Sequence, residues 1–295
     1  MIFKFFYKPA VFLLTLTLLL STACAPARDP DSTTPEVGTL STHSPTSQPS
    51  RTILPASSQI TLTPTPLLGP YICSPLKDVT LSQLSTILSN PFEMNRPGLD
   101  NGHHGVDFAF YRFGDHIGMA GLPIHSVMPG QVAATITDRP PYGNAIIIET
   151  PLAHLSQAWI KGLSLPEPGP FVEPQPATNC PDLSTALPIS NGENSLYLLY
   201  AHMQFPPTLT VGDRVSCGQE IGKVGTTGQS VNEHLHLETR VGPSGARFES
   251  MAYYDTSRTE EEAASYCIWR VSNIFRLFDP MDLLSYRTSP PSGLP

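Results

Sequence analysis

The sequence predicts a mainly β fold, and two features of the chain lead to that prediction. From residue 71 onward, short runs rich in β-branched and aromatic residues are separated by Gly and Pro, which is the pattern of strands joined by turns. Apolar residues at helical spacing are scarce over the same region. We therefore expect short strands to build the folded part of the chain, with few helices.

Six runs are the expected strands, and two more are expected helices. The strands are expected over residues 106–110, 124–127, 131–136, 145–149, 196–202 and 234–240. The helices are expected over 80–88 and 259–275, and the second opens with three glutamates, which suit the N-terminus of a helix. A Pro-rich insertion at 151–194 interrupts the strands, and long insertions of this kind are usually functional or disordered.

The first 23 residues have the features of an export signal. Lys4 and Lys8 precede an apolar stretch of 11 residues, which is shorter than the ~20 residues that a membrane-spanning helix needs. Small residues then lead into Cys24, as in a bacterial lipoprotein signal, where that cysteine is lipidated; Leu20 and Ser21 fit this pattern loosely. We expect residues 1–23 to be a signal peptide and the exported protein to be anchored in the membrane through a lipid at Cys24, facing the cell envelope or exterior. Plain secretion is the alternative.

The segment after this cysteine is expected to be a disordered linker over 24–70. Residues 25–70 contain 9 Pro and 16 Ser or Thr, and such a composition buries too little apolar surface to offset chain entropy. Beyond it we expect an N-terminal extension over 71–100, a folded domain over 101–287 that includes the insertion, and a tail over 288–295.

The charge and the cysteines restrict the function further. The chain has 17 Lys and Arg against 25 Asp and Glu, a formal net charge of −8, and this excess of acid argues against a nucleic-acid partner. Four cysteines follow Cys24, and in an exported protein an even number indicates two disulfides, whose connectivity the sequence leaves open among three possibilities. These cysteines are Cys73, Cys180, Cys217 and Cys267.

Two histidines on one predicted strand give the first chemical signal. His234 and His236 are two residues apart, so both imidazoles project from the same face, while Leu235 and Leu237 face the core. Such a pair suits a metal ligand and an acid or base beside it. Taken alone, the pair is equally compatible with a solvent-facing polar strand.

A second cluster lies upstream. His103 and Asp107 are four residues apart, with a glycine between them that permits a turn into a strand. Together with one strand histidine they would supply three N/O ligands, the arrangement in which zinc keeps an open position for water. A lone pair of this spacing often arises by chance, and His202, at the end of an apolar run, would alone be an ordinary strand-end histidine.

In this order and with the sequences between them, these pieces resemble the M23 family of zinc metallopeptidases, the LytM and lysostaphin type of peptidoglycan endopeptidase. The family's H-x-G-x-D-x-A motif matches residues 103–109. Its Tyr-Gly-Asn motif matches residues 142–144, and its Tyr-x-His motif matches residues 200–202. Its glycine-rich steps match residues 218–222 and 225–228, and its H-x-H motif matches residues 234–236. The resemblance covers residues 101–240 and does not cover the signal, the linker, the insertion or most of 241–277.

This resemblance implies a barrel-sandwich-like LytM fold of packed antiparallel sheets. It also implies that one Zn²⁺ per chain is bound by His103, Asp107 and His236. His202 and His234 would lie beside the metal-bound water and the scissile carbonyl, with their individual roles left open. His104 would either lie next to the ligand residues without binding the metal, or lie on the surface.

The expected function is hydrolysis of peptide bonds in bacterial cell-wall peptidoglycan. Two alternatives remain: a non-catalytic envelope module that binds wall peptides or activates a partner hydrolase, and a protease that acts on exported proteins. The peptidoglycan substrate rests on resemblance alone, because kinship of fold does not determine a substrate. The oligomeric state is not predicted.

Overall fold

The structure is a computed structural model that describes residues 72–188 and 192–286. The predicted signal peptide, Cys24, the linker and the tail lie outside these residues. In the described part of the chain, no helix is both long enough and apolar enough to cross a membrane.

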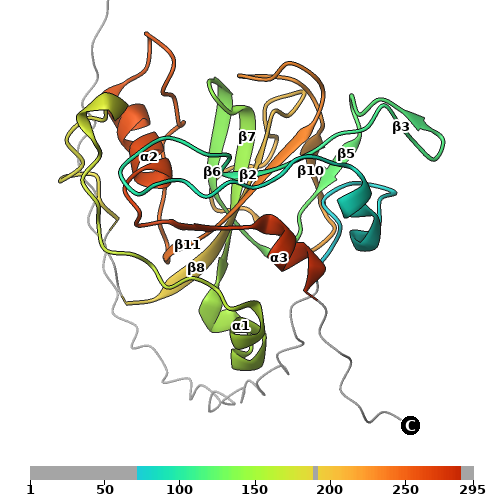
Figure 1. The fold of residues 1–295 in the computed structure, drawn as a ribbon, viewed down its shortest axis with the longest axis horizontal. Helices are drawn as coiled ribbons and strands as arrows, with labels where there is room; N and C mark the ends of the chain where they lie inside the picture. The colour runs from blue at the N-terminus through green and yellow to red at the C-terminus, as the bar shows by residue number, and fades with distance from the viewer. Residues whose placement is uncertain (1–71, 189–191, 287–295) are drawn as a thin grey trace, which may run out of the picture. The chain divides into compact units, whose positions relative to one another are not determined.

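The described residues form twelve strands and a few short helices (Figure 1). The strands are β1 (Leu88–Asn90), β2 (Gly105–Phe108), β3 (Arg112–Phe113), β4 (His116–Ile117), β5 (Pro123–His125), β6 (Gly130–Arg139), β7 (Gly143–Pro151), β8 (Asn194–Ala201), β9 (Arg214–Val215), β10 (Glu220–Lys223), β11 (Leu235–Pro243) and β12 (Arg276–Phe278). The α-helices are α1 (Gln157–Leu163), α2 (Glu260–Arg270) and α3 (Pro280–Ser285). Three short 3₁₀ helices are η1 (Leu81–Thr86), η2 (Leu152–His154) and η3 (Pro176–Thr178).

One large antiparallel sheet organises these elements. Its strand order is β1-β2-β11-β8-β7-β6-β9, and β12 also pairs with β11. The smaller sheets pair β5 with β10 and β3 with β4. Among the described residues all strand pairings are antiparallel, and β1 does not pair with β9, so the large sheet is not a closed barrel. The prediction of a mainly β fold with antiparallel sheets and few helices is confirmed.

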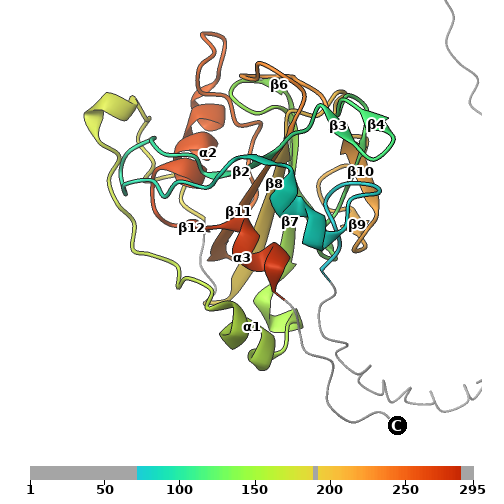
Figure 2. The same ribbon diagram turned by 45° about the vertical axis from the view of Figure 1, so that its right-hand side comes forward.

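The central strands are buried on both faces, which explains their long apolar runs. In β7, Ile146 and Ile148 belong to one hydrophobic cluster, and Ala145 and Ile147 belong to another. The first cluster also contains residues of α1 and α3, and the second contains residues of α2. The helix α2 lies beside the central strands in Figure 1, and α1 lies below β7 and β8 in Figure 2. The sheet therefore has helices packed on both faces.

Both predicted helices differ from the structure at their ends. The helix expected over 80–88 is a short 3₁₀ helix, because Leu88 pairs with Phe108 and the chain enters the large sheet there. The helix expected over 259–275 begins as predicted, with Thr259 accepting a hydrogen bond from the Glu262 amide, but it ends at Arg270. Sheet pairing thus ends the first helix early, and beyond the second the chain turns at Asn273, with a φ of +66°, and enters β12.

The described part of the insertion at 151–194 contains the short helices η2, α1 and η3. Ser156 caps α1 by accepting a hydrogen bond from the Trp159 amide, and Trp159 packs into the core. A disulfide joins Cys180 of the insertion to Cys267 of α2. The second disulfide joins Cys73 of the N-terminal extension to Cys217. The structure thus selects one of the three connectivities that the sequence leaves open.

Candidate active site

A cavity of about 490 Å³ lies where β2, β8 and β11 approach one another. The five residues predicted for metal binding and catalysis all line it. They are His103, Asp107, His202, His234 and His236. The other lining residues are Ser89, Asn90, Pro141, Tyr142, Gln229, Ser230, Val231, Asn232 and Arg270.

Strand register brings two of these side chains together. Asp107 on β2 is the direct partner of His236 on β11, and His236 is also the partner of Ala201 on β8, next to His202. The carboxylate Oδ1 of Asp107 lies 2.8 Å from Nδ1 of His236. The close approach of β2 to β11 requires Gly105, because a Cβ there would lie 2.2 Å from the carbonyl oxygen of Leu237.

His103 is held in place by the N-terminal extension. Its backbone pairs with Glu93 through hydrogen bonds in both directions, and its Nδ1–H donates to the carbonyl of Pro91 at 2.8 Å. The opposite ring nitrogen, Nε2, lies 3.2 Å from Oδ1 of Asp107. The side-chain amide of Asn90 donates to the other carboxylate oxygen, Oδ2. The extension therefore orients two of the three predicted ligands.

Hydrogen bonds outside the cluster determine which ring nitrogens face it. Since the Pro91 carbonyl can only accept, Nδ1 of His103 carries the proton and Nε2 presents a lone pair. In His236, Nε2 lies 3.3 Å from a carboxylate oxygen of Glu238, so Nε2–H donates and Nδ1 faces Asp107. Two imidazole lone pairs and a carboxylate oxygen thus converge on one point.

This donor set fits a divalent cation such as zinc. Neutral imidazole nitrogens and a carboxylate oxygen at 2.8 and 3.2 Å repel one another unless a proton or a cation lies between them. The three ligand atoms lie within 4.8 Å of one another, and tetrahedral zinc with N and O ligands needs separations of roughly 3.3 Å. Among the described residues this is the one group of three or more His, Cys, Asp or Glu side chains arranged to hold a metal ion.

The pKa values of the cluster follow from its hydrogen bonds. Burial would raise the pKa of Asp107, but its contacts with His103 and His236 outweigh burial and hold it well below its usual range. Burial would lower the pKa of His236, but hydrogen bonds to Asp107 and Glu238 raise it to about 9. Without a metal, a proton on His236 therefore occupies part of the space that a cation would fill.

His202 has a strained backbone beside the cluster. Its φ of +59° lies in the left-handed region, which is uncommon for a residue with a Cβ. Its Nδ1–H donates to the carbonyl of Thr227 at 2.8 Å, so Nε2 faces the cavity as an acceptor. The Thr227 loop lies close to Gly143, where a Cβ would meet the carbonyl carbon of Thr227 at 2.3 Å.

His234 is oriented in the same way. Its Nδ1–H donates to the carbonyl of Asn232 at 2.9 Å, and its Nε2 lies 3.6 Å from Oδ1 of Asp107. The rings of His202 and His234 are 4.7 Å apart between centroids. Burial, followed by repulsion from His236 and His234, lowers the pKa of His202 to about 3. Both side chains hold Nδ1 against a backbone carbonyl and direct Nε2 toward the cavity, so either is oriented to act on a substrate there.

Glu238 lies fully buried behind His236 and joins a dense polar network. Its Oε1 accepts from the Tyr142 hydroxyl at 2.7 Å and from Nε2 of His236. Its Oε2 accepts from the Arg240 guanidinium at 2.8 and 3.0 Å and from the Trp269 indole at 2.8 Å. Burial would raise the pKa of Glu238, but the charge of Arg240 and the His236 hydrogen bond hold it well below its usual range.

His104 belongs to this network and not to the surface. Its side chain is buried, its Nδ1 accepts from Arg240 at 2.8 Å, and its Nε2–H donates to the carbonyl of Asn101. Burial, together with the charges of Arg270 and Arg240, lowers the pKa of His104 to about 2. The surface position considered for His104 is therefore wrong, and the supporting position behind the ligands is the one observed.

Sequence patterns missed several residues of the site. Asn90 and Pro91 come from the N-terminal extension, where no motif marks them. Arg270 comes from the region that the family resemblance does not cover. Glu238 lies two residues after His236 in the sequence, and a carboxylate so close to a predicted ligand was a signal for a supporting residue.

Comparison with known proteins gives a family match over part of this site. Residues 184–248 match the family model described as peptidase family M23. This segment contains His202, His234 and His236, whereas His103 and Asp107 lie outside it.

Several solved structures are also similar. The catalytic domain of the antimicrobial peptidase lysostaphin from Staphylococcus simulans is 18% identical, with 71% of this chain and 100% of that chain covered and a TM-score of 0.35. The catalytic domain of the prophage-encoded M23 protein EnpA from Enterococcus faecalis is 22% identical, with 63% and 98% covered and a TM-score of 0.32. A zinc-containing peptidase from Vibrio cholerae is 21% identical, with 52% and 32% covered and a TM-score of 0.29.

Proposed function

We propose that this chain, a member of peptidase family M23, is a zinc-dependent endopeptidase that hydrolyses peptide bonds in bacterial cell-wall peptidoglycan. The observation that carries the proposal is the convergence of Nε2 of His103, Oδ1 of Asp107 and Nδ1 of His236 on one point, with His202 and His234 beside it. Three N/O ligands are typical of catalytic zinc, because structural zinc usually takes a fourth protein ligand.

The residues around this point support hydrolysis of an amide bond. Zinc, when bound, supplies a Lewis acid that activates water and polarises the scissile carbonyl. A neutral histidine Nε2 accepts a proton from the attacking water, and the backbone carbonyl that holds its Nδ1–H stabilises the resulting imidazolium. The imidazolium so formed can return this proton to the leaving amine, and the second histidine, with a proton taken up from solvent on Nε2, would donate a hydrogen bond to the developing oxyanion. His202 and His234 both have the geometry for either role.

The substrate class is inferred from the family. The solved relatives include lysostaphin, described as an antimicrobial peptidase, and a putative glycyl-glycine endopeptidase LytM from Ruminococcus gnavus. A cavity of about 490 Å³, lined in part by residues of β1, β2 and β11, suits an extended peptide chain. We therefore propose the peptide cross-links or stem peptides of peptidoglycan as the substrate.

We further propose that the protein is exported and held at the membrane by a lipid on Cys24. The two disulfides suit an oxidising compartment, which supports export. The Pro-rich linker at 24–70 would then hold the peptidase away from the membrane. Cys24→Ala should release the protein from the membrane fraction, and an unchanged membrane fraction would contradict the lipid anchor.

Mass spectrometry of purified muropeptides tests the enzymatic proposal. The protein is incubated with them as isolated, after chelation, and after zinc is restored. New fragments that disappear on chelation and return with zinc would support the proposal and identify the bond cleaved. Faster digestion of casein than of muropeptides would favour a protease of exported proteins, and absence of any cleavage by the zinc-loaded protein would contradict catalysis.

A further inference from the structure

Arg270 is the one Lys or Arg among the described residues that line the cavity. It stands at the C-terminal end of α2, in a region that the family match at 184–248 does not include. Its side chain lines the cavity and is 14% exposed. The hydrolytic chemistry described above does not use this residue.

The contacts of Arg270 leave one side of its guanidinium available. Nε donates to Oδ1 of Asp100 at 2.7 Å, and Nη1 lies 3.3 Å from the Tyr142 hydroxyl and 3.4 Å from Oε1 of Glu238. Nη2 makes no hydrogen bond with any described residue. Because an arginine fork binds a carboxylate through paired N–H groups, this free edge is suited to a carboxylate in the cavity.

The position of Arg270 relative to the predicted zinc ligands limits where such a carboxylate would lie. Nη1 of Arg270 and Nε2 of His236 both contact Oε1 of Glu238, at 3.4 and 3.3 Å. Arg270 is thus separated from a zinc ligand by a single carboxylate oxygen. Since residues of an extended peptide advance by about 3.3–3.6 Å each, a carboxylate within one or two residues of the scissile bond can reach Arg270.

Two segments, the insertion and the N-terminal extension, hold Arg270 in this position. The disulfide Cys180–Cys267 attaches the insertion to α2 one turn before Arg270. The side-chain amide of Asn95, in the N-terminal extension, donates to the Arg270 carbonyl at 3.1 Å. Asp100, from the same extension, accepts from Arg270 and also from the Tyr266 hydroxyl.

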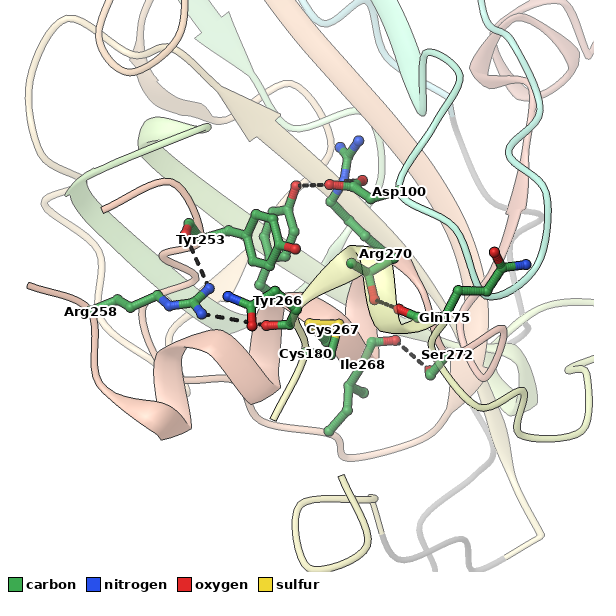
Figure 3. Close-up of a disulfide and its surroundings, with 12 residues drawn as sticks. Asp100, Gln175, Cys180, Tyr253, Arg258, Tyr266, Cys267, Ile268, Arg270 and Ser272 are labelled. Atoms are coloured by element: carbon green, nitrogen blue, oxygen red, sulfur yellow. Dashed lines mark hydrogen bonds and ion pairs between the residues drawn. A yellow bond between two sulfur atoms is a disulfide. The ribbon is translucent and has the colours of Figure 1, made fainter. Parts of the chain in front are cut away.

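Figure 3 shows Asp100, Tyr266 and Arg270 together beside the Cys180–Cys267 disulfide. An arginine held in this way loses little side-chain entropy when it binds a ligand, which favours its use in recognition.

We propose that Arg270 is a specificity-determining residue that binds a free carboxylate of the substrate peptide next to the scissile bond. This inference rests on the proposed peptidase function and adds to it a substrate class, namely peptides with an acidic group flanking the bond. A charge-assisted bond of this kind should favour the acidic substrate by about 10- to 100-fold in kcat/KM.

A matched pair of substrates tests the proposal on the zinc-loaded wild-type protein. One is the muropeptide that the protein cleaves, and the other is its synthetic analogue in which the carboxylates flanking the scissile bond are amidated. Wild type should cleave the free-carboxylate form about 10- to 100-fold better, and Arg270→Gln should remove most of this preference. Arg258→Gln is the control, since Arg258 stacks on Tyr253 and does not line the cavity.

Folding of the variants is controlled separately. Arg270→Gln leaves Asp100 without its charged partner, so the double variant Asp100→Asn/Arg270→Gln, which removes both charges, is measured beside it. Thermal unfolding and zinc content identify any variant that fails to fold, and in that case the wild-type substrate pair decides. Equal cleavage of the two substrates by wild type, or an unchanged preference in a folded variant, would overturn the proposal.

A failure of the proposed peptidase function gives a different result from a failure of the inference on Arg270. If wild type cleaves neither substrate, the proposed function fails, and calorimetric binding of both peptides to the zinc-loaded protein decides the inference. Tighter binding of the free-carboxylate peptide would support the role of Arg270, and equal binding of the two would overturn it.

Discussion

Glu238→Gln should weaken zinc binding although Glu238 is not one of the expected zinc ligands. The carboxylate accepts only, and six hydrogen bonds reach it: Oε1 takes three donors from Tyr142, His236 and Arg270, and Oε2 takes three from Arg240 and Trp269. A glutamine must place an NH₂ group against one of these sets. If this NH₂ group faced Arg240 and Trp269, both neighbours would be hydrogen-bond donors and neither could accept a hydrogen bond from it.

The alternative orientation places the amide against His236. The Tyr142 hydroxyl can rotate to accept from it, but Nε2 of His236 can accept only if its proton moves to Nδ1. Nδ1 is the nitrogen that faces Asp107 and the predicted zinc position, so this tautomer cannot bind the metal. Loss of such a supporting carboxylate typically costs 10- to 100-fold in metal affinity, which is about 1.4 to 2.7 kcal/mol.

The substitution should also reduce the stability of the fold. Arg240 is buried, and Glu238 is its charged partner at 2.8 Å, so removing the negative charge leaves a buried cation without compensation. Removing one partner of a buried ion pair lowers the unfolding free energy by about 3 to 5 kcal/mol. Zinc affinity is measured by competition with a chromophoric chelator, and the free energy of unfolding by urea denaturation of the metal-free protein.

Glu149→Gln is the matched control. Glu149 is also a buried carboxylate on the large sheet and accepts from Ser195, Tyr197 and Arg247, but it does not line the cavity. This variant should lose stability and keep the zinc affinity of wild type. If Glu238→Gln also kept wild-type zinc affinity, the tautomer assigned to His236 would be refuted.

Three further predictions concern the site and the insertion. His202→Ala and His234→Ala should each keep one zinc per chain by elemental analysis and lose about 10²- to 10⁴-fold in kcat, whereas loss of the metal in either variant would make that residue a ligand. Zinc affinity of the metal-free protein should fall about tenfold per pH unit below pH 9, because His236, with a pKa of about 9, must lose its proton to bind the metal. The same proton stabilises the metal-free fold, so its unfolding free energy should decline as pH rises from about 6.5 to about 9, and a pH-independent zinc affinity would contradict both statements. Replacing Cys180 and Cys267 together by Ser should reduce the unfolding free energy by about 2 to 4 kcal/mol, because the bond closes a loop of 87 residues, and an unchanged urea midpoint would count against that bond.

The sequence was sufficient to predict the class of fold and the five side chains that meet in the cavity. Strand alternation placed His234 and His236 together, and all six predicted strands are present with shifted ends. The strands and the His234–His236 pair are readable because they depend on local periodicity, whereas His103, Asp107 and His202 were joined to that pair by the resemblance to the M23 family. The roles of the five residues stay predictions until metal and activity are measured.

The rest of the site depends on contacts between distant segments, which no local pattern encodes. The orientation of His103 depends on the Pro91 carbonyl, and the position of Arg270 depends on α2, the extension and the Cys180–Cys267 disulfide. Four cysteines indicate two disulfides, but only the fold selects the pairing. His104 appeared peripheral because the sequence does not show that Arg240 is buried next to it.

Crystallography of the zinc-loaded protein with anomalous data at the zinc edge tests the proposed metal site most directly. One anomalous peak should lie about 2.0–2.2 Å from Nε2 of His103, from one carboxylate oxygen of Asp107 and from Nδ1 of His236, with Nε2 of His202 and His234 facing it. A peak bound by other residues, or full zinc occupancy with Nε2 of His236 as the ligand atom, would contradict the proposed site.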